Sequence, residues 1–238
     1  MTNELKISRT GIEQHIRCPK CFYMQRKLGL KPPSMVPLTL AVATDALLKN
    51  EFDVVRQSGS SHPLWKREGL NLRAFQHNDI DIWRSNFKGM RVVHSSGAEI
   101  YGAVDDIWEN LDTGDLHVVD YKSTSKKDEP TIDTGFGDSY KRQMEIYQWL
   151  FRKAGFKINS IGYFLYVNGS KQGNFYENGT DGVMHFETTM ISYAGDDSWV
   201  DDAVDGAINC MQADSIPKSG IDCDNCRYYY DRKIFEPN

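Results

Sequence analysis

The chain has 238 residues, of which 40% are hydrophobic and 12% aromatic, so it can bury the core of one large domain or two small ones. Its net charge of −5 argues against a protein that coats nucleic acid by charge alone, because such binding requires clustered lysines and arginines. No apolar run approaches the ~20 residues of a membrane span, and no signal-like segment begins the chain. We expect a soluble, cytoplasmic protein with no membrane partner.

The first predicted element is a short helix over residues 7–16, with Ser8 as its N-cap and with Ile12 and Ile16 on one face. A longer helix is predicted over residues 38–56, with Leu40, Ala43, Leu47 and Val54 on one side. The intervening prolines separate the two helices. Residues 58–90 lack a sustained period, so we predict irregular structure there.

Two Cys-x-x-Cys pairs lie near opposite ends of the chain. Cys18 and Cys21 follow the first helix, and Cys223 and Cys226 lie close to the C-terminus. Four thiolates are the ligand set of a tetrahedral Zn²⁺ ion or of an iron–sulfur cluster, and a cytosolic chain keeps them reduced. Independent redox or structural cysteines are the alternative. A shared site predicts that the two ends meet in a small metal-stapled lobe, built from about 8–35 and 210–238.

Residues 99–122 predict a β-hairpin, because runs rich in Val, Ile, Tyr and Trp flank the turn sequence Asp-Thr-Gly-Asp at 112–115. With the loop centred between residues 113 and 114, Asp105 lies opposite Lys122 and Ile107 opposite Asp120. Side chains alternate along each strand, so Asp105, Asp120 and Lys122 share one face. Asp106 then points to the other face, beside Tyr121.

The shared face has the composition of a metal site. Two carboxylates and an ammonium form a poor core unless a cation compensates them, and carboxylate oxygens suit Mg²⁺ or Mn²⁺. Lys122 is then placed to orient an attacking water or to meet charge that develops on phosphorus. A solvated hairpin with an Asp–Lys pair is the alternative interpretation.

The rest of the chain predicts an α/β core, in which helices flank a mixed central sheet. A polar loop over 123–137 leads to a helix over 139–154, on which Gln143 and Tyr147 share a face. Their spacing alone also fits ordinary helix packing. Strands are predicted at 158–167 and 182–191, and a helix at 198–211, where Cys210 suits a small buried thiol.

These pieces in order resemble the RecB-like branch of the PD-(D/E)XK nuclease superfamily. The carriers are Gly102-x-x-Asp105, Asp120-x-Lys122 and Gln143-x-x-x-Tyr147. The resemblance covers roughly residues 8–230 and implies one nuclease-like domain over 1–238. Its restriction-endonuclease-like core would span about 36–195.

The resemblance also implies roles for these residues. Asp105 and Asp120 would bind the divalent metal, Lys122 would act on water, and Gln143 and Tyr147 would orient the strand or support the lysine. A histidine that ligates the metal in the branch is replaced here by Asp45, at the end of Ala41-x-x-x-Asp45. An aspartate is a suitable ligand for a hard cation, and a polar surface residue is the alternative.

Nucleases of CRISPR adaptation and of the AddB type, in the same branch, hold a 4Fe-4S cluster with one N-terminal and three C-terminal cysteines. Cys18 occupies the N-terminal position, but no third cysteine follows Cys226, so Cys21 would be the fourth ligand. The resemblance therefore favours a 4Fe-4S cluster, with Zn²⁺ as the alternative.

The function expected from this sequence is metal-dependent hydrolysis of DNA, single-stranded or at ends, in repair, recombination or defence. Two alternatives stay open. One is a nuclease that acts on RNA, and the other is a non-catalytic module that docks a helicase or other repair protein. The intact set of Asp105, Asp120 and Lys122 weighs against the second.

Overall fold

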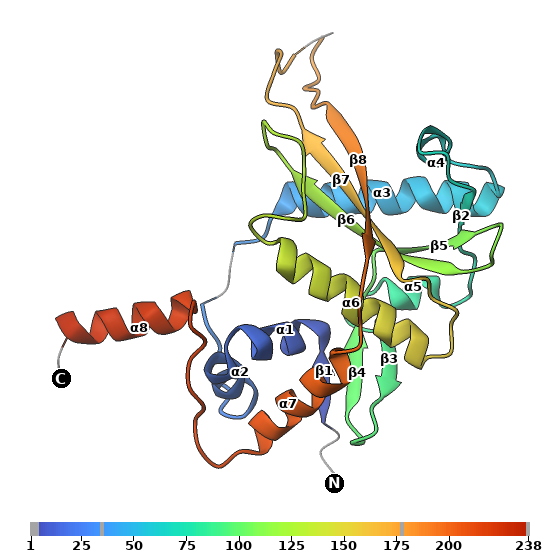
Figure 1. Cartoon of the computed structure of the whole chain (residues 1–238). Coiled ribbons are helices and arrows are strands. Elements are labelled where there is room, and N and C mark those ends of the chain that lie inside the picture. Colours follow the sequence, from blue (N-terminus) through green and yellow to red (C-terminus); the bar gives the residue numbers. More distant parts are fainter. Residues whose placement is uncertain (1–4, 34–35, 177–178, 237–238) are drawn as a thin grey trace.

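A computed structural model describes residues 5–33, 36–176 and 179–236 and shows two mixed sheets flanked by helices (Figure 1). The helices are α1 (Arg9–Arg17), α2 (Pro19–Arg26), α3 (Thr39–Ser58), α4 (Pro63–Arg67), α5 (Ile80–Trp83), α6 (Gly137–Lys153), α7 (Val200–Gln212) and α8 (Asp224–Phe235). The strands are β1 (Lys6–Ser8), β2 (Leu72–Ala74), β3 (Met90–Val93), β4 (Glu99–Gly102), β5 (Asp106–Asn110), β6 (Leu116–Thr124), β7 (Ile161–Gly169) and β8 (Phe186–Ala194). The predicted mixed α/β class is confirmed, although the strands form two sheets instead of one.

The larger sheet has the order β2-β5-β6-β7-β8, in which β6 and β7 are parallel and the other neighbours antiparallel. The smaller sheet has the order β1-β4-β3, with β1 and β4 parallel. Both α3 and α6 contact β6. Strand β6 is therefore the element against which the two long helices pack.

The two helices pack on opposite faces of β6. Val119 and Tyr121 belong to a core cluster that contains Phe52 of α3. Because side chains alternate along a strand, Asp120 and Lys122 point to the other face, where α6 lies. The pleat of one strand thus separates the charged residues from the aromatic core under α3.

The predicted helix at 38–56 is confirmed as α3, but its apolar stripe does not face the core. Leu40, Leu47 and Val54 are 74%, 66% and 65% exposed. The side of α3 that faces the sheet carries Phe52 and Val55, which are buried in the core, and in the preceding turns Asp45 and Lys49, which form ion pairs. Burial of this helix is decided by charge pairing at the site as well as by hydrophobic area.

The predicted hairpin is present, but its first strand is broken into β4 and β5, which lie in different sheets. The predicted register is wrong by two residues, because Ile107 pairs with Val118 and not with Asp120. Asp105 precedes β5 and does not pair with Lys122. A shift of two residues keeps every side chain on its face.

The turn explains the register. The side-chain Oδ1 of Asn110 accepts hydrogen bonds from the backbone N–H of Asp112 and Thr113, at 2.9 and 3.2 Å. The backbone N–H of Gly114 donates to the Asn110 carbonyl at 2.8 Å. Together these bonds centre the loop one residue earlier than the composition of the turn predicts.

The cysteine-containing ends of the chain meet beside α1, α2 and α7, as a shared cysteine site predicts (Figure 1). Helix α1 is capped as predicted, since the Ser8 hydroxyl accepts from Gly11 N at 3.1 Å. Helices α2 and α8 were not predicted. The stretch 58–90 is less irregular than expected, because it contains α4, β2 and α5. No helix among the described residues has both the length and the apolar character needed to cross a membrane.

Candidate active site and cysteine centre

The predicted site residues lie around the break between β4 and β5. Asp105 follows the break, and its Oδ2 accepts a hydrogen bond from the backbone N–H of Tyr121 at 2.8 Å. This bond holds the carboxylate next to β6, close to Asp120. The side chain of Asp105 remains 24% exposed, whereas Asp120 is fully buried. One carboxylate therefore meets solvent and the other lies behind it.

Lys122 is held by groups from two elements. Its ammonium forms an ion pair with Asp120 Oδ2, and it donates to Gln143 Oε1 at 3.3 Å. The same ammonium lies 4.4 Å from the ring centroid of Tyr140, a cation–π distance. The side chain is 14% exposed, so its charge is fixed at one place beside the carboxylates.

Gln143 joins the residues of β6 to helix α6. Its Nε2 donates to Asp120 Oδ1 at 2.8 Å and to the Tyr147 hydroxyl at 3.2 Å. Gln143 and Tyr147 are one helical turn apart, and α6 directs both toward Asp120. The structure thus places Gln143 and Tyr147 of α6 beside Asp120 and Lys122 of β6.

Gly102 explains why the first motif needs a glycine. A Cβ at this position would lie 2.8 Å from Cε1 of Tyr147, closer than side chains approach one another. The end of β4 and the ring of Tyr147 therefore pack directly together. This contact fixes the edge of the site where the chain turns toward Asp105.

The charges of the site perturb one another. Burial and the nearby charge of Asp120 raise the pKa of Asp105 to about 7, and Lys49 and Lys122 oppose this rise. Burial alone would lower the pKa of Lys122, but the carboxylates of Asp120 and Asp105 outweigh it and raise the pKa. Lys122 therefore stays charged, while Asp105 exchanges a proton near neutral pH.

The carboxylates fit a divalent cation. Asp120 Oδ2 is buried, and the Lys122 ammonium forms an ion pair with it. Asp105 lies close enough to Asp120 for the second carboxylate charge to raise its pKa. Two neighbouring carboxylates at a largely buried site repel each other. A hard cation with oxygen ligands would relieve this repulsion.

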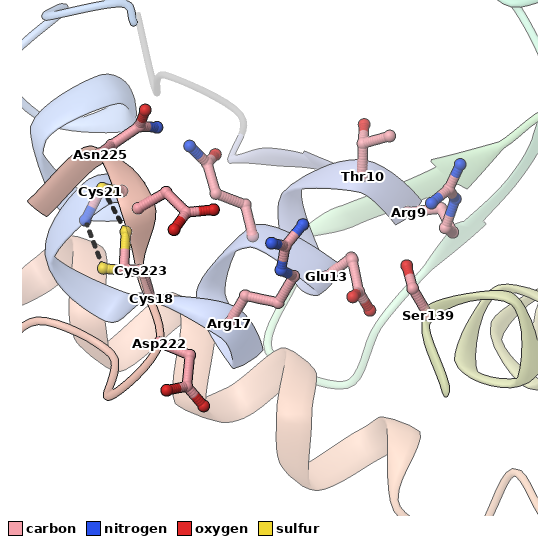
Figure 2. Close-up of a pocket in the computed structure, with 12 residues that line it drawn as sticks. Arg9, Thr10, Glu13, Arg17, Cys18, Cys21, Ser139, Asp222, Cys223 and Asn225 are labelled. Atoms are coloured by element: carbon pink, nitrogen blue, oxygen red, sulfur yellow. Dashed lines mark hydrogen bonds between the residues drawn. The ribbon is translucent and has the colours of Figure 1, made fainter. Parts of the chain in front are cut away.

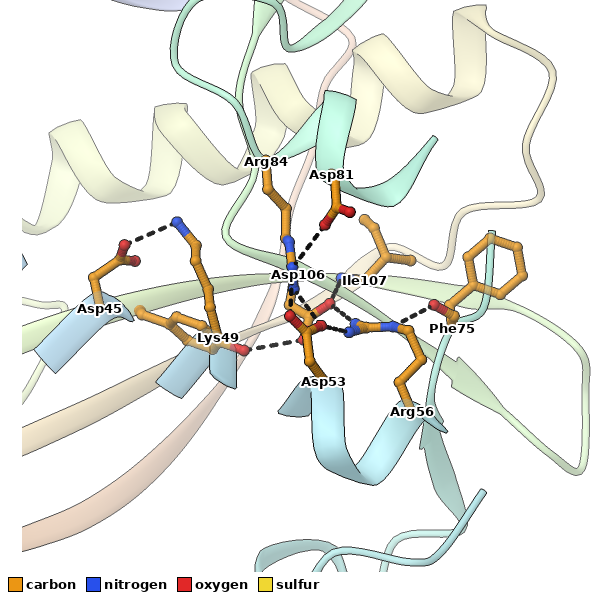
Figure 3. Close-up of polar contacts among 10 residues, drawn as sticks. Asp45, Lys49, Asp53, Arg56, Phe75, Asp81, Arg84, Asp106 and Ile107 are labelled. Atoms are coloured by element: carbon orange, nitrogen blue, oxygen red, sulfur yellow. Dashed lines mark hydrogen bonds and ion pairs between the residues drawn. The ribbon is translucent and has the colours of Figure 1, made fainter. Parts of the chain in front are cut away.

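Asp45 reaches the same site through Lys49, which lies one turn later on α3 (Figure 3). Its Oδ2 accepts from the Lys49 ammonium at 2.9 Å, and that ammonium lies 3.5 Å from Asp105 Oδ1. One cationic group therefore reaches both carboxylates from α3. Lys49 was not singled out from the sequence, although its position four residues after Asp45 places it on the same helix face.

Asp106 lies on the α3 face, as the alternation predicts, and its contact with Tyr121 is confirmed. The Tyr121 hydroxyl donates to Asp106 Oδ2 at 3.0 Å, and Arg56 forms an ion pair with the same carboxylate (Figure 3). Arg84 bonds both oxygens of Asp53 at 2.8 Å beside this pair. This buried network lies behind the strand that carries Asp120 and holds it against α3.

The four predicted cysteines form one group. Cys21 Sγ lies 3.5 Å from Cys223 Sγ (Figure 2). Cys226 Sγ lies 3.6 Å from Cys21 Sγ and 3.7 Å from Cys18 Sγ. Four sulfurs at about 2.3 Å from one tetrahedral ion would be about 3.8 Å apart. Cys210 lies outside this group, with its Sγ 3.6 Å from the Pro19 carbonyl.

Backbone donors prepare Cys18 to act as a ligand. Its Sγ accepts from the N–H of Gly220 at 3.2 Å and of Cys21 at 3.4 Å. Burial raises the pKa of this thiol, but the two bonds outweigh it and lower the pKa to about 7. Gly220 is needed for this approach, since a Cβ there would lie 2.0 Å from the Arg17 carbonyl oxygen.

A comparison with family models matches residues 6–229 of the chain to the PD-(D/E)XK nuclease superfamily. A search of curated proteins finds no match. The family match begins within β1 and ends within α8, so it includes both the carboxylate site and the cysteine centre.

Proposed function

We propose that this chain, which belongs to the PD-(D/E)XK nuclease superfamily, hydrolyses phosphodiester bonds in DNA with the help of Mg²⁺ or Mn²⁺, on single strands or at ends. The observation that carries the proposal is the convergence of Asp105, Asp120 and Lys122 at the break between β4 and β5. A purely structural ion pair between Asp120 and Lys122 would not need a second carboxylate beside it.

A bound divalent cation would polarise the phosphate and activate water. Each side chain of the site then has a separate role. Asp105 and Asp120 hold the ion, and Lys122 orients the water and stabilises negative charge on the phosphate oxygens. Gln143 fixes both Asp120 and Lys122 through its amide, and Tyr147 supports Gln143 from the next turn of α6.

We also propose Asp45 as a metal ligand. The contact of one Lys49 ammonium with both Asp45 and Asp105 supports this assignment, because it places a single cation within reach of both carboxylates. Binding of the metal by Asp45 then requires Lys49 to withdraw. A lysine that competes with the metal would lower affinity without preventing binding.

For the cysteine centre, the sulfur spacing favours one Zn²⁺ ion over the 4Fe-4S cluster that the RecB-like resemblance implies. In a cluster each cysteine binds a different iron, which separates the sulfurs by more than the edge of a single-ion tetrahedron. Distances of 3.5–3.7 Å match the single-ion case. We propose a structural role, since four thiolates leave no open position for substrate.

A cleavage assay on end-labelled single- and double-stranded DNA and RNA, with Mg²⁺, Mn²⁺ or EDTA, tests the proposed function. We expect cleavage of single-stranded DNA or DNA ends that EDTA abolishes. Cleavage of RNA alone would assign the RNA alternative. Binding without cleavage of any of these substrates would contradict the nuclease assignment and favour the docking module.

A further inference from the structure

A groove runs along α1 from the cysteine centre to Arg9 and Thr10 (Figure 2). Its main cavity of about 470 Å³ is lined by Arg9, Thr10 and Arg17, together with the cysteine turns. A smaller hollow of about 100 Å³ shares Arg9 and Thr10 and reaches Gly102 and Tyr147. The two cavities are therefore neighbours that share Arg9 and Thr10, and the smaller one extends to Tyr147, whose hydroxyl accepts a hydrogen bond from Gln143 of the site.

The charges along these cavities favour an anion. Arg9, Glu13 and Arg17 follow one another at four-residue spacing on α1, so they share a face. Both carboxylate oxygens of Glu13 accept from Arg142 at 2.8 Å, which leaves Glu13 unable to neutralise its helix neighbours. Among the described residues, the ion pairs include neither Arg9 nor Arg17, and Arg9 lies 5.9 Å over the Tyr147 ring.

The spacing of the two arginines suits two phosphates of a strand that are separated by an intervening phosphate. Eight residues of α-helix separate Arg9 from Arg17 by about 12 Å along the axis. Asp222 and Asp224 also line the cavity, at its cysteine end, and Asp224 is paired with Arg227. The end of the groove nearest the catalytic centre is thus the more positive one.

Beyond the cysteine centre, α8 projects from the body of the molecule (Figure 1). Tyr229 and Tyr230 are 49% and 47% exposed. Lys20 bonds the Tyr230 hydroxyl at 2.7 Å and lies 4.8 Å over its ring, and Lys233 lies 5.0 Å over the Tyr229 ring. Neither lysine has a carboxylate ion pair within the described residues. Exposed rings with adjacent cations are typical of surfaces that bind single-stranded nucleic acid by stacking.

We propose that α1 and α8 form an entry track for a single nucleic-acid strand. Arg9 and Arg17 contact its phosphates, and Tyr229 and Tyr230 stack its bases at the distal end. The inference rests on the proposed function, because the track leads to Tyr147 and the carboxylates. A duplex does not fit this description, since its bases are not available for stacking on α8.

The test measures binding without cleavage. Fluorescence anisotropy with labelled oligo-dT, oligo-U and a blunt duplex is recorded over a salt series, with every variant in a Lys122→Ala background. Arg17→Ala should reduce the slope of log affinity against log salt by about 0.7 for single strands. The matched control Arg73→Ala removes an exposed arginine of β2 that pairs with Glu109, and it should leave the slope unchanged.

The tyrosines are tested by a different readout. The double variant Tyr229→Leu/Tyr230→Leu should weaken single-strand binding by at least about fivefold and keep the salt slope, since stacking involves no charge. Tyr229→Phe/Tyr230→Phe keeps both rings and should bind like the parent. Metal content of each variant, measured by elemental analysis, should be unchanged and shows that the lobe is intact.

Unchanged binding in both Arg17→Ala and the leucine double variant would overturn the track. Equal losses in Arg73→Ala, or equal losses for the duplex, would overturn it as well.

These results are independent of catalysis. If wild-type protein cleaves nucleic acid while these variants bind normally, the track is wrong and the function stands. If the variants lose binding while wild-type protein cleaves no substrate, the track stands and the nuclease assignment fails. Comparison of oligo-dT with oligo-U identifies the preferred sugar.

Discussion

The raised pKa of Asp105 predicts that metal binding depends on pH near neutrality. Burial and the charge of Asp120 place this pKa at about 7, and a proton on Asp105 competes with the cation. A carboxyl of that pKa is about one-tenth ionised at pH 6 and about nine-tenths ionised at pH 8. Affinity for Mn²⁺ should therefore increase by about tenfold between these pH values.

Isothermal titration of Mn²⁺ into the protein at pH 6, 7 and 8 measures this change. The stability of the metal-free protein changes with pH in the opposite direction to the metal affinity. The folded state holds the Asp105 proton to higher pH than the unfolded state, so metal-free stability should fall as pH rises from about 4 to about 7. Asp105→Asn should flatten the stability profile, and Asp106→Asn should affect metal affinity less. An affinity that does not change between pH 6 and 8, or that falls, would refute the reasoning.

Three further variants test the structure around the site. Arg56→Met should destabilise the protein by about 3–5 kcal/mol in urea unfolding, because it leaves the fully buried Asp106 without its nearest cation. Gly102→Ala should lower the melting temperature and reduce cleavage, because the added methyl displaces the Tyr147 ring, at a cost of about 1–3 kcal/mol. Cys226→Ser should release the bound metal, measured by elemental analysis, and lower the melting temperature before it affects activity.

Each of these variants has a control. Arg56→Met/Asp106→Leu removes both charges and should recover most of the stability, whereas a loss under about 1 kcal/mol in Arg56→Met alone would mean that the pair is solvated. Gly102→Ala should cost little stability when Tyr147 is also changed to Ala. Cys210→Ser should keep the metal, and metal loss there with none in Cys226→Ser would contradict the four-cysteine site.

The site was more predictable than the strands that carry it. Alternation along a strand placed Asp106 beside Tyr121, and this held despite a register error of two residues, because an even shift leaves the faces unchanged. The error came from the turn. Composition located the loop, but the side chain of Asn110 decides where it is centred.

For helix α3, the sequence predicted the helix itself but not the side that faces the sheet. Its apolar residues are regularly spaced, so a periodicity argument favours burying Leu40, Leu47 and Val54, yet all three are exposed. The side that faces the sheet carries Phe52 and Val55, which are buried in the core, together with Lys49. The ion pair between Lys49 and Asp105 joins residues far apart in the sequence, so spacing along the helix does not show it.

The most direct test of the account compares wild-type protein with Lys122→Ala in Mn²⁺-dependent cleavage of single-stranded DNA. Removal of the ammonium leaves both carboxylates in place, so the variant should still bind Mn²⁺, fold, and lose cleavage by at least about a hundredfold. Lys157→Ala, which removes an exposed lysine paired with Asp115, should cleave like wild type. Wild-type turnover by Lys122→Ala would contradict the assignment of Asp105, Asp120 and Lys122 as the catalytic centre.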